Sequence, residues 1–213
     1  NLSEILTHIR HSEKIFLMRI FLSVLILIFS LQSLTKADDI SDFEIEGMSI
    51  GDSLLDYFSE EEIKSSKQKT QYPGSDRYII LTFIQYARFE TYDSIQIDYK
   101  KNDKEYIIAS IMGMLPFPDD IHACYEKQKK IAKEVDLLFP QSKKSDGKQK
   151  KAFDKSGKST SYLYEFHLST GSVVQISCDD WSEELTNKHN LFDHLGVSVM
   201  GKDLVYFLYN EAY

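Results

Sequence analysis

Residues 92–115 read YDSIQIDYKKNDKEYIIASIMGML and hold the clearest local pattern in the chain. Apolar and polar side chains alternate up to Tyr99, as in a β-strand with one buried face. Lys101 to Lys104 (KNDK) supplies turn residues, and Glu105 to Leu115 is apolar enough for a returning strand. The segment therefore predicts an antiparallel hairpin.

A long helix is predicted directly after this hairpin. Pro118 lacks the amide that would be unpaired in a first helical turn, and Asp119-Asp120 complements the helix dipole. The helical pattern continues to Phe139, where Pro140 ends it. Its apolar stripe contains Ile121, Cys124, Tyr125, Gln128, Ile131, Val135 and Leu138. This spacing predicts an amphipathic helix that packs on a sheet.

Other segments rich in β-branched and aromatic residues lie on both sides of the helix. They are Ile40–Ile45, Tyr78–Tyr86, Tyr162–Leu168, Val173–Cys178, Val197–Met200 and Leu204–Tyr209. The first of them, Ile40–Ile45, is expected to be a strand or an extended lead-in. Tyr78–Tyr86 is apolar at nearly every position, which favours a strand covered on both faces. Together these patterns predict one α+β domain, an antiparallel β-sheet with one long amphipathic helix packed on it.

Short helices are expected at two further places. Asp52 or Ser53 can cap a helix that reaches Phe58, and Ser59 with Glu62 matches a capping box before Glu60–Ser65. These features predict a short helical N-terminal segment. The acidic stretch Asp179–Asn190 predicts another short helix.

Residues 141–160 have a different composition, with seven lysines and few apolar side chains. We expect a mobile, Lys-rich loop or a long hairpin excursion. A solvated loop is the preferred interpretation, because no aromatic residues alternate with the lysines. Contact with anionic lipid, peptidoglycan carboxylates or an acidic partner is the alternative.

Residues 18–37 have the features of a signal peptide. Arg19 follows Met18, the apolar run Ile20–Leu34 comes next, and Thr35-Lys36-Ala37 places small residues before a cleavage site. Cleavage near Ala37 would leave residues 38–213 as one periplasmic or secreted domain. We expect residues 1–17 to be an upstream extension, or else a long basic n-region.

An uncleaved anchor is the competing interpretation of the same segment. The apolar run holds about 15 residues, whereas a spanning helix needs about 20. No cysteine lies at the exit, which argues against a lipoprotein. Contact with the membrane is therefore expected only through the signal segment.

Charge limits the range of partners. The chain carries 25 Lys and Arg against 33 Asp and Glu, a net charge of −8. The first 37 residues hold four basic and two acidic side chains, so the remainder carries −10. An acidic surface repels phosphate backbones, so nucleic acid is not an expected partner. An envelope protein or a small ligand remains open.

Cys124 and Cys178 are the only cysteines of the chain. Cys124 lies on the apolar stripe of the predicted helix, and Cys178 lies on the strand face of Val174 and Ile176. If the helix packs on that face, both sulfur atoms point into one interface. An oxidising compartment then favours a disulfide over two buried thiols, which are the alternative.

The acidic and histidine patterns do not match known metal sites. Asp179, Asp180, Glu183 and Glu184 surround Trp181, but they lack the glycine of a calcium loop, and a capped helix start is favoured. His189 and His194 are five residues apart, whereas two ligands on one helix face would be three or four apart. His122 and His167 could join them only through the tertiary fold.

Nucleophilic chemistry has little support. A cysteine beside a histidine would suit a thiolate nucleophile, but a structural disulfide explains both cysteines more simply. Gly47 to Gly51 contains a Gly-x-Ser-x-Gly pattern, yet no convincing central strand precedes it. The sequence thus predicts no catalytic residues, no metal and no cofactor.

Aromatic side chains are the candidates for ligand binding. Tyr162, Tyr164 and Phe166 share one strand face, and Trp181 follows soon after. Alternating aromatics usually belong to a core. If one sheet face stays open, Tyr162, Tyr164 and Trp181 would bind a sugar, a peptide or an apolar ligand.

Residues 43–58 read FEIEGMSIGDSLLDYF and contain the box Gly-Met-Ser-x-Gly-Asp-Ser-Leu-Leu. The segment resembles the opening of a family of small exported proteins from Pelagibacter-like marine alphaproteobacteria, which share a signal peptide, hairpins and a cysteine-bearing helix. The likeness covers most of residues 38–213 and implies no activity. Gly47-Met48-Ser49 also looks like the start of the BamE/SmpA outer-membrane assembly lipoproteins, without their lipid-bearing cysteine.

From these features we expect an exported, non-enzymatic protein that binds a ligand or partner. An envelope hydrolase is one alternative, and a membrane-tethered accessory factor with an uncleaved signal anchor is another. Polar residues clustered in a deep pocket would favour the enzyme, and an apolar groove without such a cluster would favour binding.

Overall fold

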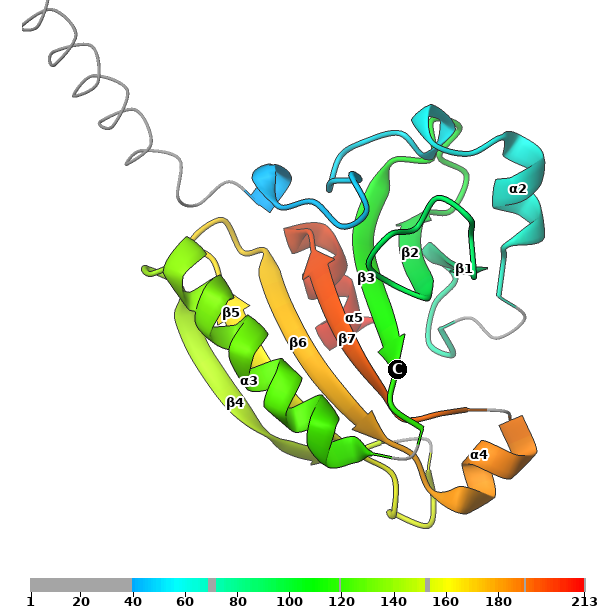
Figure 1. Ribbon diagram of the computed structural model, residues 1–213. Coiled ribbons are helices and arrows are strands. Elements are labelled where there is room, and N and C mark those ends of the chain that lie inside the picture. The colour runs from blue at the N-terminus through cyan, green and yellow to red at the C-terminus, as the bar shows by residue number, and fades with distance from the viewer. Residues whose placement is uncertain (1–39, 69–71, 119, 152–153, 190, 213) are drawn as a thin grey trace, which may run out of the picture. The chain divides into compact units, whose positions relative to one another are not determined.

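The computed structural model describes residues 40–213, except for 69–71, 119, 152–153, 190 and 213 (Figure 1). The predicted leader (18–37) and the preceding residues 1–17 lie outside the described residues. Within the described part of the chain, no helix has the length and hydropathy needed to cross a membrane.

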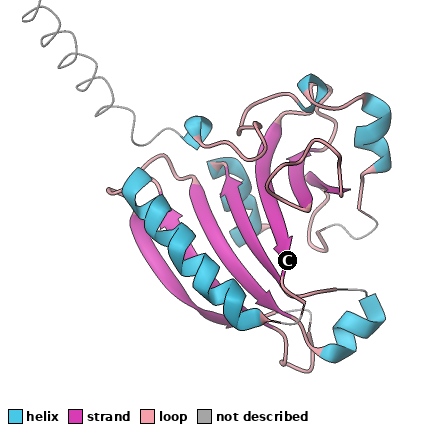
Figure 2. Cartoon of the chain, viewed as in Figure 1, coloured by secondary structure: helices cyan, strands magenta, loops and turns pink. Residues whose placement is uncertain are grey.

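Within these residues, seven strands form one antiparallel sheet in the order β1-β2-β3-β7-β6-β5-β4 (Figure 2). The strands are β1 (Tyr78–Ile84), β2 (Ser94–Lys100), β3 (Ile108–Pro116), β4 (Lys143–Lys150), β5 (Thr160–His167), β6 (Val173–Asp180) and β7 (His194–Met200). The helices are η1 (Ile40–Asp42), η2 (Leu54–Asp56), α2 (Glu60–Ser65), α3 (Ile121–Leu138), α4 (Glu183–His189) and α5 (Lys202–Asn210). The predicted α+β class, with an antiparallel sheet and one long helix, is confirmed.

The predicted hairpin is β2 and β3. Ile97 pairs with Ile111, and a bulge follows at Asp98/Tyr99. The turn contains Asn102 at φ 69°, a left-handed conformation that asparagine tolerates better than most residues.

One face of the sheet, here called the helix face, carries the main core. α3 packs on β5, β6 and β7, and Figure 1 shows it lying along these strands. The N-terminal segment covers the β1–β3 half of the same face, where Phe58 stacks on Phe83 with ring centroids 3.9 Å apart. The predicted capping box is confirmed, since Ser59 and Glu62 bond reciprocally at the start of α2.

The opposite face, here called the polar face, carries Asp98, Ser110, Ser198 and Asp179 on neighbouring strands. α5 lies on this side, behind the sheet in Figure 1, near one end of the strands. A second, smaller core forms there from Tyr78, Leu204, Phe207 and Ala212.

Two predicted strands are wrong. Ile40–Ile45 is not a strand: its first three residues form η1, and Ile45 makes only an isolated bridge to Met48. Leu204–Tyr209 belongs to helix α5. The spacing of Leu204, Phe207 and Leu208 suits a helix, and Phe207 is buried against Tyr78 on the polar face.

The Lys-rich segment is not a mobile loop over its first half. Lys143–Lys150 is the edge strand β4, paired with β5, so the hairpin alternative describes it. The side chains of β4 are almost all exposed, so its sequence lacks the apolar alternation that predicts a strand. β4 forms because the edge of β5 offers it backbone hydrogen bonds. Asp179 and Asp180 end strand β6, and the predicted acidic helix is shorter, beginning at Glu183.

Candidate functional site

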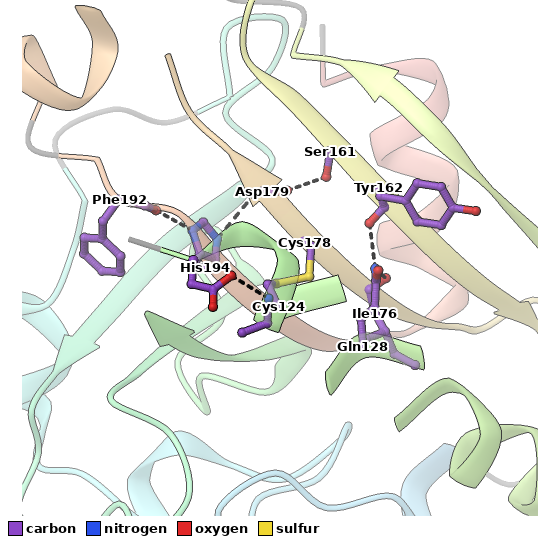
Figure 3. Close-up of a disulfide and its surroundings, with 11 residues drawn as sticks. Cys124, Gln128, Ser161, Tyr162, Ile176, Cys178, Asp179, Phe192 and His194 are labelled. Carbon is purple, nitrogen blue, oxygen red and sulfur yellow. Dashed lines mark hydrogen bonds and ion pairs between the residues drawn. A yellow bond between two sulfur atoms is a disulfide. The ribbon is translucent and has the colours of Figure 1, made fainter. Parts of the chain in front are cut away.

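The disulfide joins α3 to the middle of the sheet. Cys124 and Cys178 are bonded, their Cα atoms are 6.0 Å apart, and both side chains are fully buried. Figure 3 shows the bond running from the helix to β6. The predicted pairing is confirmed, and neither sulfur atom is a free thiolate in this state.

Gln128 makes a second attachment one helical turn after Cys124. Its Nε2 atom donates to the carbonyl oxygens of Tyr162 at 2.7 Å and Ile176 at 2.8 Å. The side chain is buried, so both hydrogen bonds are sheltered from water. The disulfide and this amide together fix the position of α3 on β5 and β6.

Tyr162 and Tyr164, two of the predicted ligand-binding residues, lie on the helix face of β5. Tyr125 of α3 contacts Tyr162, with ring centroids 6.2 Å apart, and both predicted tyrosines are half-buried. The hydroxyl of Tyr162 donates to Asp146 at 2.7 Å, and this hydrogen bond raises the pKa of Tyr162 to about 12. α3 therefore covers the face that an aromatic binding surface would need open.

Trp181, the third predicted ligand-binding residue, lies away from the two tyrosines. It stacks on His194, with ring centroids 6.4 Å apart, and Lys151 Nζ lies 5.0 Å from its ring centroid. His194 is on the polar face, because its neighbour Leu195 faces α3 opposite Cys178. The structure therefore does not bring Trp181 together with the two tyrosines.

A buried polar cluster surrounds Asp179, and Figure 3 shows Ser161 and His194 on either side of this residue. The carboxylate accepts from Ser161 Oγ and from Lys151 Nζ at 2.6 Å, and His194 Nε2 lies 3.4 Å away. In a serine hydrolase the histidine lies between the serine and the acid. Here Asp179 lies between Ser161 and His194, so the arrangement neutralises a buried charge and does not activate the serine.

A second, more exposed cluster joins β4 to β5. Ser145 Oγ donates to Glu165 at 3.0 Å, and His167 Nε2 lies 3.4 Å from both Ser145 Oγ and the Glu165 carboxylate. The same ring nitrogen faces the serine and the acid, so the histidine does not link them as it does in a serine hydrolase. His189 is exposed at the end of α4. Within the described ranges, no group of three or more His, Cys, Asp or Glu side chains is placed to hold a metal ion.

A cavity of about 580 Å³ lies at the other end of the strands from the Asp179 cluster. It is open to solvent on one side, and it is lined by Tyr78 of β1 and by four further parts of the chain: the N-terminal segment, the β2–β3 hairpin, the β5–β6 turn and the start of α5. Its lining residues are Ile40, Ile50, Gly51, Tyr78, Lys100, Asp103, Ile107, Ile108, Ala109, Thr170, Ser172, Gly201, Lys202, Asp203 and Leu204. Apolar side chains form most of the walls.

Sequence reasoning missed this cavity because it placed a strand where α5 begins. The helical spacing of Leu204, Phe207 and Leu208, with an acidic residue in the first turn, was the available signal. No local pattern links Tyr78 to the turn at Gly201, since β1 and α5 meet only in the folded chain.

The acidic side chains of the cavity are already paired. Lys100 Nζ donates to Asp203 at 2.9 Å, and this bond raises the pKa of Lys100 and lowers that of Asp203. Asp103 accepts from the amides of Glu105 at 3.0 Å and Ile107 at 3.2 Å, which closes the hairpin turn.

Two kinds of polar group beside the cavity make no hydrogen bond within the described residues. Gly201 caps α5 without a side-chain hydrogen bond, so the amides of the first helical turn are unsatisfied among the described residues. Tyr78 is fully buried, and its hydroxyl has no hydrogen-bond partner in the described part of the chain. Burial raises the pKa of Tyr78, so the hydroxyl stays protonated at neutral pH.

Asp98 is a buried carboxyl on the polar face near this end of the sheet. It accepts from Ser110 Oγ and from Tyr72 Oη, the latter at 2.8 Å. Burial raises the pKa of Asp98 to about 6, although both hydrogen bonds oppose the shift.

Comparison of the chain with protein-family models, curated proteins and solved structures finds no match.

Proposed function

We propose that this is an exported, non-enzymatic binding protein that takes a small, mainly apolar ligand into the cavity beside α5. The cavity carries the proposal, because its volume of about 580 Å³ lies within the range of about 300–1,000 Å³ found for small-molecule pockets. Its isoleucine, alanine and leucine walls, with a few polar groups at defined places, also match such pockets.

The geometry supports binding more than the hydrolase alternative. Two clusters of the described residues contain a serine, a histidine and an acid, and in neither does the histidine link the other two. Asp179 lies between Ser161 and His194, and one nitrogen of His167 faces both Ser145 and Glu165. The acids of the cavity are paired, and its lining contains no histidine or cysteine.

Export is supported by the leader pattern in residues 18–37 and by the disulfide, since disulfides persist in oxidising compartments. The resemblance of residues 43–58 to exported proteins supports the same location. N-terminal sequencing of the native protein tests this part: we expect a start near Asp38. A native cytosolic product with residues 18–37 intact would contradict export, and a membrane-bound one would support the tethered alternative.

Binding is tested with the neutral fluorescent probe N-phenyl-1-naphthylamine. We expect saturable binding by the purified protein, which Thr170→Trp abolishes because Thr170 is an exposed residue at the rim of the cavity. The control Asn187→Trp adds the same side chain at an exposed site on α4, outside the lining, and should bind normally. Absent or non-saturable fluorescence with the unmodified protein would contradict the proposed function.

A further inference from the structure

We infer that the outer edge of β4 is a docking site for an acidic, extended segment of a partner protein, which adds a further strand to the sheet. No residue of β4 lines the cavity, so this inference does not depend on the proposed small ligand. Two properties of β4 carry it: an open backbone edge and a local excess of positive charge.

The outer edge of β4 is open. β4 and β1 are the two edge strands of the sheet, and Figure 1 shows β4 at its outer margin. The edge of β1 is covered, because the amide of Thr82 donates to Ser66 at 2.8 Å and that of Gln68 donates to Ile80 at 3.0 Å. β4 pairs with β5 on one side, and its other side makes no backbone hydrogen bond to the described residues. Its outward-facing amides and carbonyls are therefore available to another chain.

β4 lacks two of the features that usually close an exposed edge. Proteins protect such edges with bulges, prolines or charged side chains. The pairing of β4 with β5 runs without a register shift from Lys143 to Lys150, and the strand contains no proline. Charge alone limits which strands can join this edge.

The charge of β4 is opposite to that of the chain around it. Four of its eight residues are lysines and Asp146 is its one acid, a net charge of +3, whereas residues 38–213 together carry −10. Lys144 pairs with Asp136 of α3. The other three lysines of β4 make no salt bridge within the described part of the chain.

This charge selects the partner. A second copy of the chain is disfavoured, because two paired β4 strands would bring four lysines from each copy into one ribbon. An acidic strand would place carboxylates beside the lysines, while its backbone hydrogen bonds supply affinity. An anionic lipid surface would use the charge and leave the backbone groups of the edge unpaired.

The positions of the lysines define the spacing of the acids in the partner. Lys148 pairs with Tyr162 and so projects on the helix face, and Lys144 and Lys150 lie an even number of residues away, on the same face. A partner strand with Asp or Glu at every second position presents its carboxylates on that face as well.

The probe is the peptide TETETETE, blocked at both ends and labelled with tetramethylrhodamine. We expect saturable binding to the full-length protein by fluorescence anisotropy. The same peptide with every backbone amide N-methylated keeps its charge but cannot donate to a strand, and should bind about tenfold more weakly or not at all. In hydrogen exchange, amides of Lys143–Lys150 should become protected when the unmethylated peptide is added.

Lys148→Glu/Lys150→Glu should weaken peptide binding about tenfold, because like charges then face one another. Lys127→Glu/Lys130→Glu is the matched control, since it makes the same change of net charge at exposed positions of α3 and should bind normally. Equal loss in the two variants would show that the peptide responds to net charge alone and would overturn the assignment to β4.

Two further outcomes would contradict the inference. Equal binding of the methylated and unmethylated peptides would exclude strand addition, and this comparison uses the unmodified protein, so it holds even if a variant fails to fold. Binding to vesicles of phosphatidylcholine and phosphatidylglycerol without binding to the peptide would assign the lysines to a lipid surface. Either result would leave the cavity, which the naphthylamine probe tests separately, unaffected.

Discussion

Gln128 of α3 donates from Nε2 to the carbonyl oxygen of Tyr162 at 2.7 Å, and the same nitrogen reaches the carbonyl oxygen of Ile176. A helix side chain thus bonds the backbones of two adjacent strands. Since Cys124 is covalently attached one turn earlier, α3 has both a covalent and a polar contact with β6.

Gln128→Glu should lower the free energy of unfolding at pH 7 by about 3 kcal/mol, because the carboxylate would face two carbonyl oxygens without a donor. The loss should shrink at pH 5, where a protonated carboxyl can donate. Urea denaturation at both pH values measures it. Gln149→Glu makes the same change on exposed β4 and should stay within about 0.5 kcal/mol of wild type. Equal effects at the two sites would contradict the role of Gln128.

Removal of the disulfide should lower the free energy of unfolding by more than Gln128→Glu does. Cys124 and Cys178 are 54 residues apart, and closure of a loop of that length is worth about 4 kcal/mol in the chain-entropy model. We expect Cys124→Ala/Cys178→Ala to lower the urea midpoint accordingly, and wild type in reducing agent to shift by a similar amount. Two free thiols in unreduced protein by mass spectrometry would show that the bond is not formed.

Gly113 is predicted to tolerate no side chain. A Cβ atom at this position would lie 2.5 Å from Cγ of Tyr92, so Gly113→Ala must displace a half-buried ring. Overpacking of this kind costs about 1–3 kcal/mol, measurable by thermal or urea denaturation. Gly147→Ala on β4 is the control, since nothing lies within 4 Å of its Cβ position. Wild-type stability of Gly113→Ala would show that the ring does not occupy this place.

Asp98 should make the free energy of unfolding depend on pH between about 4 and 7. Its pKa in the folded protein is about 6 against an ordinary 3.8, so the native state binds the proton more tightly than the unfolded chain. The contribution of Asp98 to the free energy of unfolding is therefore fully present below pH 3.8 and is lost as the pH rises through 6.

Asp98→Asn keeps the shape of the side chain without a titrating group. The stability of wild type minus that of the variant should fall by on the order of 2 kcal/mol between pH 4 and pH 7. Urea denaturation across this range provides the measurement. A constant difference would mean that Asp98 titrates normally.

The elements that the sequence predicted well are those with local determinants. Ser59 and Glu62 define a helix start by themselves, Pro140 ends α3, and the alternation around Ile97 specifies the face of β2. The disulfide was also predictable, since one helical stripe and one strand face sufficed to bring two sulfur atoms into the same interface.

The wrong predictions concern segments whose secondary structure is determined by tertiary contacts. Lys143–Lys150 has no apolar alternation and is a strand only because β5 offers an unpaired edge. Leu204–Tyr209 is apolar enough for a strand, but Phe207 must reach Tyr78 on the polar face, and a helix places it there. The cavity depends on the same contact, so it could not be predicted while α5 was taken as a strand.

The pairing of β3 with β7 at the centre of the sheet has a consequence for biogenesis. During synthesis the N-terminus emerges first, and α3 and three strands separate β3 from β7 along the chain. One edge of β3 therefore stays unpaired until β7, which ends at Met200, has been synthesised. During that interval the first three strands can join a neighbouring nascent chain through the same edge. Proteins that shield emerging strands would act in this window, and a chain that stops before His194 would remain a target for proteolysis.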